Sequence, residues 1–392
     1  MTIDFPRIFL TLGFLGLFFV ATNSTFINNT YSENSSYSVH IPDLEGASTS
    51  AIVNEKTNKV YITEFYEGKL VVLDGKTNEI LESIDGIQTP FGVGVNPETN
   101  LVYVGGEYAD TISIFNGTTN KVIKEITLKD PYDIIVNPNN NTIYVTSDRE
   151  NLVSIIDGNT NEIVSSFEVL VPCGITVNPK TGMVYVTSES ENALHVWDGN
   201  ANQPITTINV QNSPRGVTVN PVTNMVYVTN QEDNTVTVID GETNEIIKSI
   251  DVGEIPRRVI SNPESNIIYV SNQGSKDISV IDGFENKVIE TIPVPEPFEL
   301  AINSKTGKLY SMYYGGNLSI ITKNPLYASP LKQIFFGTEP HEIKCNENLV
   351  LIIKSNGIPA CVRENTAISL EERGWGSLAN LVDSKNPSSP PS

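Results

Sequence analysis

Residues 220–246 read NPVTNMVYVTNQEDNTVTVIDGETNEI, and close copies of this stretch recur along the chain at intervals of 41 or 42 residues. The leading asparagine stands at Asn54, Asn96, Asn137, Asn178, Asn220, Asn262 and Asn303. A tyrosine keeps the same register in every copy, at Tyr61, Tyr103, Tyr144, Tyr185, Tyr227, Tyr269 and Tyr310. A repeat of this length that persists over seven copies predicts one structural unit used seven times.

Each copy contains four short runs rich in Val, Ile, Thr and Tyr that alternate with period two. In the fifth copy these runs predict strands over residues 216–219, 225–229, 235–239 and 246–250. Asn-Pro-x-Thr-Asn and Asp-Gly-x-Thr-Asn sequences separate the strands, and the Asp-Gly pairs favour turns with positive φ. Core packing accounts for the repeated tyrosines.

A single four-stranded sheet of this kind cannot bury both of its apolar faces. Radial stacking of such sheets buries them, and four strands in about 40–45 residues is typical of a propeller blade. We therefore predict an all-β, seven-bladed β-propeller over residues 37–325, with four antiparallel strands per blade. The fourth strand of the last copy is unclear in the sequence, so we expect an N-terminal strand at residues 38–41 to complete the seventh blade.

The tyrosine-containing strand also carries a family resemblance. Residues 227–230 read YVTN, and residues 144–147, 185–188 and 269–272 read YVTS, YVTS and YVSN. The chain resembles the YVTN β-propeller repeat family of archaeal surface-layer and related secreted proteins. That resemblance implies an extracellular or cell-surface propeller and no single activity, because propellers serve many functions.

The first residues of the chain predict export. Residues 8–20 are mostly apolar, follow Arg7 and number 13. They are too few to span about 30 Å of hydrocarbon, so we predict a signal peptide at residues 1–22, with an uncleaved anchor as the alternative. A polar linker follows at residues 23–36. Export would permit N-glycosylation at six candidate sequons, Asn23, Asn28, Asn34, Asn116, Asn140 and Asn317.

The sequence changes character after the repeats, and we predict a small C-terminal module at residues 329–376. It resembles a short module of secreted proteins from ammonia-oxidising archaea. Cys345 and Cys361 flank strand-like runs, and in an exported protein we expect them to form a disulfide. One short helix is expected at residues 365–373, ended by Gly374, with Trp375 packed back onto it. Residues 377–392 are rich in Pro and Ser and predict a disordered tail.

Two sets of loops lie at opposite ends of the predicted blades. The Asn-Pro and Asp-Gly turns are nearly uniform, whereas the loops between second and third strands vary from copy to copy. Uniform turns are explained by the structural requirements of the fold, whereas variable loops can differ to bind a partner. We therefore place a binding face on the variable loops. The candidate residues are Glu64, Tyr66, Glu107, Tyr108, Asp148, Arg149, Glu189, Glu191, Gln231, Asp233, Gln273, Tyr313 and Tyr314.

A second candidate set stands at the mouth of the central channel, where each first strand begins. Three aromatic residues and two arginines there could hold a ring-shaped or anionic ligand, although simple plugging of the channel would also explain them. This set comprises Thr49, Phe91, Tyr132, Cys173, Arg215, Arg257 and Phe298. A nucleophilic role for Cys173 would need a nearby histidine, and His195 is the nearest in sequence.

Composition narrows the function classes. With 25 Lys+Arg against 46 Asp+Glu the net charge is −21, which argues against a nucleic-acid partner. Three His and three Cys do not suit a multi-histidine metal enzyme. The acidic loops lack an Asp-x-Asp-x-Asp-Gly sequence, so we predict no metal. No Gly-x-Ser-x-Gly elbow, phosphate loop or dinucleotide fingerprint occurs in a suitable context, so we also predict no cofactor and no catalytic residue. No second long apolar run follows residue 20, which predicts no membrane span in the mature chain.

We therefore expect a non-enzymatic binding module, secreted or at the cell surface, that uses its variable loops to bind a protein or a glycan. The alternative is a lactonase- or lyase-type enzyme that uses the channel mouth. A third possibility is a purely structural part of a surface layer.

Overall fold

The structure is a computed structural model that describes residues 44, 47–313, 317–322, 340, 343, 345, 349–355 and 357–378. The predicted signal peptide, the linker with its three sequons, the closing strand at residues 38–41 and the tail beyond residue 378 lie outside the described residues. No helix among the described residues is long and apolar enough to cross a membrane.

The described part of the repeat region forms six four-stranded antiparallel sheets and one three-stranded sheet. The first three sheets consist of β1 (Ser48–Asn54), β2 (Lys59–Glu64), β3 (Lys69–Asp74) and β4 (Ile80–Asp85); β5 (Pro90–Asn96), β6 (Leu101–Gly106), β7 (Thr111–Asn116) and β8 (Lys121–Thr127); and β9 (Ile134–Asn137), β10 (Thr142–Ser147), β11 (Leu152–Asp157) and β12 (Glu162–Glu168).

The other four sheets follow in chain order. They consist of β13 (Pro172–Val177), β14 (Met183–Ser188), β15 (Ala193–Asp198) and β16 (Gln203–Asn209); β17 (Pro214–Asn220), β18 (Met225–Asn230), β19 (Thr235–Asp240) and β20 (Ile246–Asp251); β21 (Pro256–Asn262), β22 (Ile267–Asn272), β23 (Asp277–Asp282) and β24 (Lys287–Pro293); and β25 (Glu299–Asn303), β26 (Lys308–Tyr313) and β27 (Asn317–Thr322). The strands predicted for the fifth copy are confirmed to within two residues.

Burial explains which strand of each sheet carries the apolar pattern. The second and third strands are buried along most of their length, whereas the fourth strand is largely exposed. The repeated tyrosine of the second strand is buried in every copy, and Tyr227 is fully buried. Each apolar cluster combines side chains from two successive sheets, so the packing is face to face.

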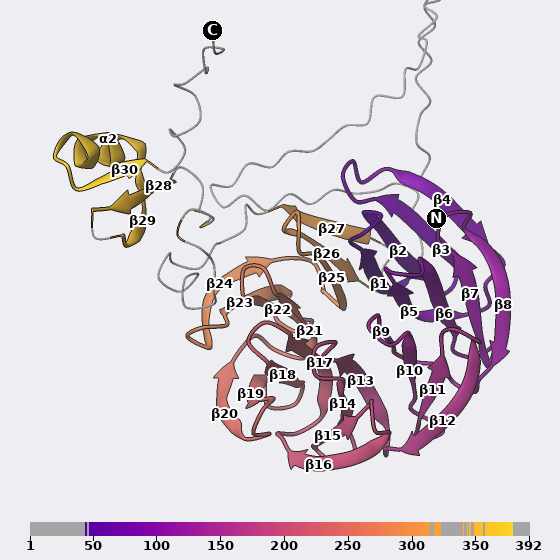
Figure 1. The fold of residues 1–392 in the computed structure, drawn as a ribbon. Coiled ribbons are helices and arrows are strands. Elements are labelled where there is room, and N and C mark those ends of the chain that lie inside the picture. Colours follow the sequence, from indigo (N-terminus) through magenta and orange to yellow (C-terminus); the bar gives the residue numbers. More distant parts are fainter. Residues whose placement is uncertain are drawn as a thin grey trace, which may run out of the picture.

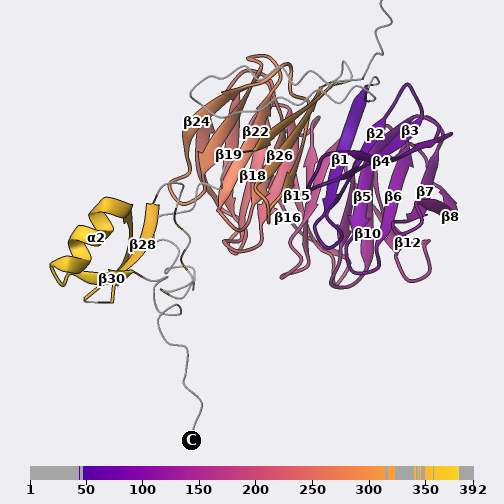
Figure 2. The ribbon, with the colours of Figure 1, turned by 90° about the horizontal axis from the view of Figure 1, so that it is seen from above.

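The first and last of these sheets are also neighbours. Strand β1 contacts β25, and Figure 1 shows the sheet of β25–β27 beside β1, with the first strand of each sheet innermost. Val60 and Val71 of the first sheet share one apolar cluster with Tyr310 and Met312 of the last. Figure 2, turned by 90° from Figure 1, shows the sheets packed side by side. The described residues thus have a propeller-like arrangement.

The uniform turns bind neighbouring sheets together through their asparagines. The leading asparagine of one turn donates from Nδ2 to Oδ1 of the last asparagine in the next sheet's turn, as from Asn178 to Asn224 at 2.6 Å. The bond also joins the last sheet to the first, from Asn303 to Asn58 at 2.7 Å. Equivalent bonds run from Asn54 to Asn100, from Asn96 to Asn141 and from Asn220 to Asn266.

The expectation of positive φ at the Asp-Gly pairs is wrong. The residue that ends the turn adopts the left-handed conformation instead, with φ of 60° at Asn244 and 57° at Asn224, and it is asparagine except at Gly182 and Gly307. Asparagine tolerates this conformation better than most residues. Gly241 is needed for space, because a Cβ there would stand 2.5 Å from the carbonyl oxygen of Asn224.

The C-terminal module contains β28 (Leu349–Lys354), β29 (Pro359–Arg363), α2 (Glu364–Glu372) and β30 (Gly376–Leu378). Helix α2 lies within one residue of the expected bounds, whereas β30 was not predicted from the sequence. Cys345 and Cys361 form a disulfide, as expected. Gly374 follows the helix with φ of 70°, in agreement with its predicted role. Trp375 is 63% exposed, so most of its surface is not covered by the helix.

Candidate functional site

The seven first strands meet around one cavity of about 50 Å³. A water molecule needs about 10–15 Å³ measured in this way, so the cavity has room for roughly four. The variable loops lie at the same end, since the backbone N–H of Gln231 bonds the carbonyl of Ser213, two residues before Arg215. All seven predicted mouth residues line the cavity: Thr49, Phe91, Tyr132, Cys173, Arg215, Arg257 and Phe298.

The threonine of the YVTN stretch positions these residues. Thr229 Oγ1 accepts a hydrogen bond from the Gly216 N–H at 2.8 Å and donates one to the carbonyl of Arg257 in the next sheet, also at 2.8 Å. Thr187 bonds the carbonyl of Arg215 in the same way at 2.7 Å. The repeat thus holds the main chain of a mouth residue with a side chain of the preceding sheet. Equivalent hydroxyl groups are those of Thr63, Thr146 and Ser271.

The floor of the cavity is made by three charged residues that the sequence analysis missed. Arg258 Nη1 lies 2.7 Å from Asp133 Oδ2, and Arg258 Nε lies 2.8 Å from Glu299 Oε1. These residues follow directly after mouth residues, at a position that is otherwise small. The occurrence of three charged residues at a position that is Gly or Ser in the other copies is the sequence signal that could have identified them. The full set at this position is Ser50, Gly92, Asp133, Gly174, Gly216, Arg258 and Glu299.

Burial governs the ionisation of this floor. It raises the pKa of the Glu299 carboxyl to about 7, although the Arg258 guanidinium opposes the shift. Burial alone would lower the pKa of the Arg258 guanidinium. The Asp133 and Glu299 carboxylates outweigh this effect and raise that pKa. The cation of the floor is therefore permanent, and the charge of Glu299 depends on pH.

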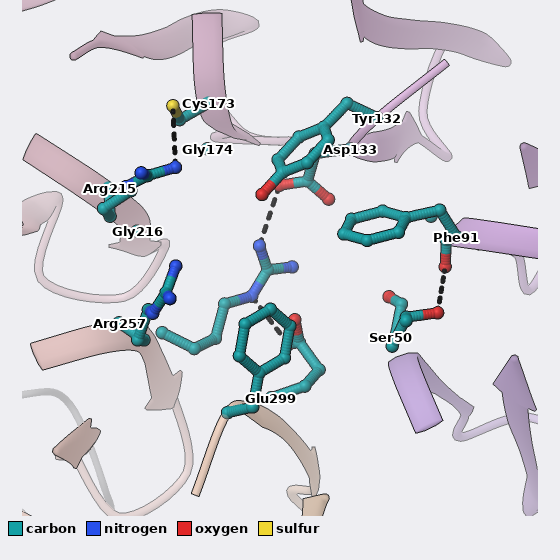
Figure 3. Close-up of a pocket in the computed structure, with 14 residues that line it drawn as sticks. Ser50, Phe91, Tyr132, Asp133, Cys173, Gly174, Arg215, Gly216, Arg257 and Glu299 are labelled. Atoms are coloured by element: carbon teal, nitrogen blue, oxygen red, sulfur yellow. Dashed lines mark hydrogen bonds and ion pairs between the residues drawn. The ribbon is translucent and has the colours of Figure 1, made fainter. Parts of the chain in front are cut away.

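Two further arginines line the upper wall. Arg215 Nη2 lies 2.9 Å from Glu189 Oε1, and its Nη1 lies 3.7 Å from Cys173 Sγ. Arg257 Nε donates to Gln273 Oε1 at 3.0 Å, and its guanidinium carbon lies 5.1 Å from the centre of the Phe298 ring. Figure 3 shows both arginines on neighbouring strands, with Tyr132 and Phe91 across the pocket.

An aromatic run leads from the cavity to the surface. The Phe91 and Tyr132 rings stack with their centres 4.6 Å apart, and Phe65 meets Phe91 edge to face at 6.2 Å. Phe65 also contacts the rings of Tyr66 and Tyr108 at 5.3 and 5.8 Å. Those two tyrosines are 71% and 61% exposed. We call Phe65, Tyr66 and Tyr108 the aromatic patch.

The thiol of Cys173 is not activated. Its side chain is buried, and burial raises the pKa of the thiol to about 12, so it is protonated at neutral pH. His195 does not meet it: its ring nitrogens lie within hydrogen-bond distance of Glu191 and Thr207 instead. The structure therefore does not bring together the Cys–His pair that a nucleophilic thiol would need.

Three of the predicted loop residues, Glu107, Asp148 and Arg149, form a charged cluster beside the aromatic patch. Arg149 forms an ion pair with Asp130, and its guanidinium lies over the Tyr108 ring, 4.6 Å from the centre. Arg149 Nη2 also lies 3.6 Å from Glu107 Oε1. Burial and the neighbouring Asp130 raise the pKa of Asp148 to about 7. Asp130, which the sequence analysis did not select, anchors this cluster.

The other predicted loop residues are scattered around the same end. Glu64 is buried at the end of β2, and Tyr313 ends β26. Asp233 accepts a hydrogen bond from the Asn212 N–H at 2.6 Å. Tyr314 lies outside the described residues. No group of three His, Cys, Asp or Glu that could hold a metal occurs within the part of the chain that the structure describes.

Two of the three sequons in the repeats lie at the ends of strands, and the third lies in a turn. Asn116 ends β7, where its Oδ1 accepts hydrogen bonds from the N–H groups of Thr118 and Thr119. Asn140 is exposed in a uniform turn. Asn317 begins β27. Glycosylation at these sites remains a prediction.

The comparisons with known proteins give a fold and no family. No protein-family model and no curated protein matches this chain. Among solved structures it resembles a chain of Kuenenia stuttgartiensis hydrazine synthase with a TM-score of 0.65 and 15% identity. The match covers 75% of this chain and 99% of that chain. Identity at that level supports a shared fold alone.

Proposed function

We propose that this protein is a secreted or cell-surface propeller of the YVTN type that acts as a non-enzymatic binding module. Its partner, a protein or a glycan, docks on the variable loops. The observation that carries this proposal is the aromatic patch, where Tyr66 and Tyr108 stand exposed on a packed Phe65. Rigid aromatic side chains lose little entropy on binding and are enriched in the centres of interfaces.

The architecture in this proposal is a closed ring of seven blades. The contact of β1 with β25 and the apolar cluster shared by the two sheets support closure. The hydrogen bond between Asn303 and Asn58 continues the pattern that joins the other sheets. In this architecture, residues 38–41 supply the fourth strand beside β27. The proposal places Tyr66, Tyr108 and the cavity on one face of the ring.

Export is the second element of the proposal. The disulfide between Cys345 and Cys361 is of a kind that persists in oxidising compartments. The predicted signal peptide at residues 1–22 would deliver the chain there. The net charge of −21 would keep such a protein soluble and repel nucleic acids.

The cavity gives the enzymatic alternative little support. Its floor carboxylates, Asp133 and Glu299, both bond Arg258, and the thiol of Cys173 is protonated. Nucleophilic catalysis needs a group that is free to attack. Glu299, with its pKa raised to about 7, is the floor carboxyl that this electrostatic environment poises for proton exchange, and it is held by Arg258. A binding role requires neither attack nor proton exchange.

Binding to isolated cell envelopes of the source organism tests the proposal. We compare the native sequence with the double variant Tyr66→Ala/Tyr108→Ala and with Val222→Ala, which truncates an exposed apolar residue in a uniform turn. Each tyrosine that anchors a partner is worth about 2 kcal/mol, or ~30-fold in Kd, so the double variant should bind roughly 1000-fold more weakly if both tyrosines contact the partner and ~30-fold more weakly if one does. Val222→Ala should bind normally.

Two outcomes decide the matter. Equal binding by the double variant and by Val222→Ala would contradict a partner site at the aromatic patch. Enzymatic removal of envelope glycans separates the two partner classes, because it abolishes binding to a glycan and spares binding to a protein. Regular two-dimensional arrays of the purified protein in electron microscopy would instead indicate a purely structural surface-layer part.

A further inference from the structure

Arg257 is the arginine of the cavity that lacks an acidic partner. Among the described residues it forms no ion pair, and its guanidinium makes one hydrogen bond, from Nε to the neutral Gln273 Oε1. Arg258 has two carboxylate partners and Arg215 has one. A half-buried guanidinium without a carboxylate leaves several strong donors to be satisfied by whatever occupies the cavity.

A second guanidinium adds to this demand. Arg215 lies on the neighbouring first strand, and its Nε is buried without a hydrogen-bond partner. Burial and the like charge of Arg215 both lower the pKa of Arg257, so the two guanidinium groups repel each other. An anion between them would relieve the repulsion and accept the free donors.

We propose that this cavity binds a carboxylate group, which Arg257 and Arg215 hold by hydrogen bonds while Phe298 and Tyr132 flank it. A small carboxylic acid would bind whole, and a longer molecule would enter with its carboxylate first. This inference goes beyond the proposed function, because the ligand need not contact the aromatic patch.

Size and charge favour a carboxylate over larger or more highly charged anions. The cavity of about 50 Å³ has room for roughly four waters, which matches a group of three or four heavy atoms. The planar guanidinium matches a carboxylate in a bidentate pair. One arginine lacks an acidic partner, so one negative charge balances it. A second negative charge on the ligand would be repelled by the Glu189 and Asp133 carboxylates and by the protein's net charge of −21.

Titration calorimetry of the purified full-length chain with sodium acetate tests the proposal, with inorganic phosphate as comparator at constant ionic strength. We expect saturable acetate binding with a Kd of about 1 mM or below, which is within reach of a ligand of four heavy atoms. Absence of saturable binding up to about 50 mM acetate would overturn the proposal. Tighter binding of phosphate than of acetate would overturn the assignment to a carboxylate.

Two variants locate the site. Gln273→Glu places a carboxylate where Oε1 now accepts from Arg257 Nε, so it should weaken acetate binding at least ~10-fold and raise the melting temperature. Gln203→Glu adds the same charge on the exposed outer strand β16 and should leave acetate binding unchanged. Arg257→Gln should remove binding altogether.

Unchanged acetate affinity in both Gln273→Glu and Arg257→Gln would place any acetate site elsewhere and contradict the proposal. Because the readout is acetate binding to the purified protein, failure here leaves the envelope-binding test unaffected. Failure of that test likewise leaves this one standing.

Discussion

Arg258 and Asp133 form an ion pair with 2.7 Å between Nη1 and Oδ2, although 125 residues of chain separate them. Arg258 lies in β21 and Asp133 immediately precedes β9. These two strands are not neighbours, because β13 and β17 lie between them. The pair therefore crosses the centre of the molecule. Together with Glu299 it closes the cavity beneath the mouth residues and gives three separate sheets a shared electrostatic contact.

Removing the central cation should destabilise the fold. Arg258→Met leaves the Asp133 and Glu299 carboxyls buried without a cation, and we expect the free energy of unfolding at about pH 8 to fall by roughly 2–4 kcal/mol. At about pH 5 the loss should be smaller, because Glu299, with its pKa raised to about 7, is protonated there. Urea unfolding at the two pH values measures both effects.

The control for this prediction is Lys56→Met. Lys56 forms an exposed ion pair with Glu98, and such pairs contribute about 0–1 kcal/mol. Equal losses of stability in the two variants would show that the central ion pair has no special role.

Asp148→Asn should stabilise the protein in a pH-dependent way. The pKa of Asp148 is raised to about 7 in the fold, so the folded state binds its proton more tightly than the unfolded chain. The free energy of unfolding of the native sequence therefore falls as pH rises from about 4 to about 7. The asparagine amide replaces the protonated carboxyl beside Asp130 and carries no such penalty.

We expect Asp148→Asn to exceed the native sequence in stability at about pH 8 and the difference to vanish near pH 4. Chemical denaturation across this range measures it. A difference that stays constant with pH would contradict a raised pKa at this residue.

The asparagine that ends a uniform turn should respond differently to alanine and to glycine. Asn224 has φ of 57°, and its Oδ1 accepts from Asn178 Nδ2. Asn224→Ala should cost about 2–3 kcal/mol, from the left-handed conformation and the lost hydrogen bond. Asn224→Gly should cost only about 1 kcal/mol, and Gly182 and Gly307 fill this position in two other repeats. Equal losses in denaturant unfolding would refute this explanation.

The repeat made the fold of residues 48–322 predictable, because its period sets strand, turn and buried tyrosine seven times over. The mouth residues were found because each occupies the same register position. Asp133, Arg258 and Glu299 were missed although they follow directly after mouth residues. Their pairing depends on which sheets face one another across the centre, and that relationship exists only once the sheets are assembled.

The aromatic patch was predicted in part. Tyr66 and Tyr108 were selected from the variable loops, but nothing in their spacing showed that both rings rest on Phe65. The left-handed turn asparagines were also misassigned to glycine, because Asp-Gly is a strong turn signal and the geometric demand on Gly241 is for space.

The disulfide should stabilise the C-terminal module. It closes a loop with a sequence separation of 16, which is worth about 3 kcal/mol in the chain-entropy model. Cys345→Ser/Cys361→Ser should therefore make the segment 349–378 more susceptible to proteolysis, as measured by mass spectrometry of the cleavage products. Unaltered resistance of that segment to proteolysis would show that its strands and helix α2 stay folded without the disulfide.

The central claim is that the ring closes, so that the last sheet supports the first, and hydrogen exchange tests it most directly. Met312 of β26 is fully buried in the cluster that contains Val60 and Val71. Met312→Ala should cost about 2–5 kcal/mol and speed amide exchange in β2 and β3 as well as in β25–β27. Val228→Ala, which truncates a cluster between the fourth and fifth sheets, should leave β2 and β3 unchanged. Exchange in β2 and β3 that is equally slow in Met312→Ala and in the native sequence would contradict closure.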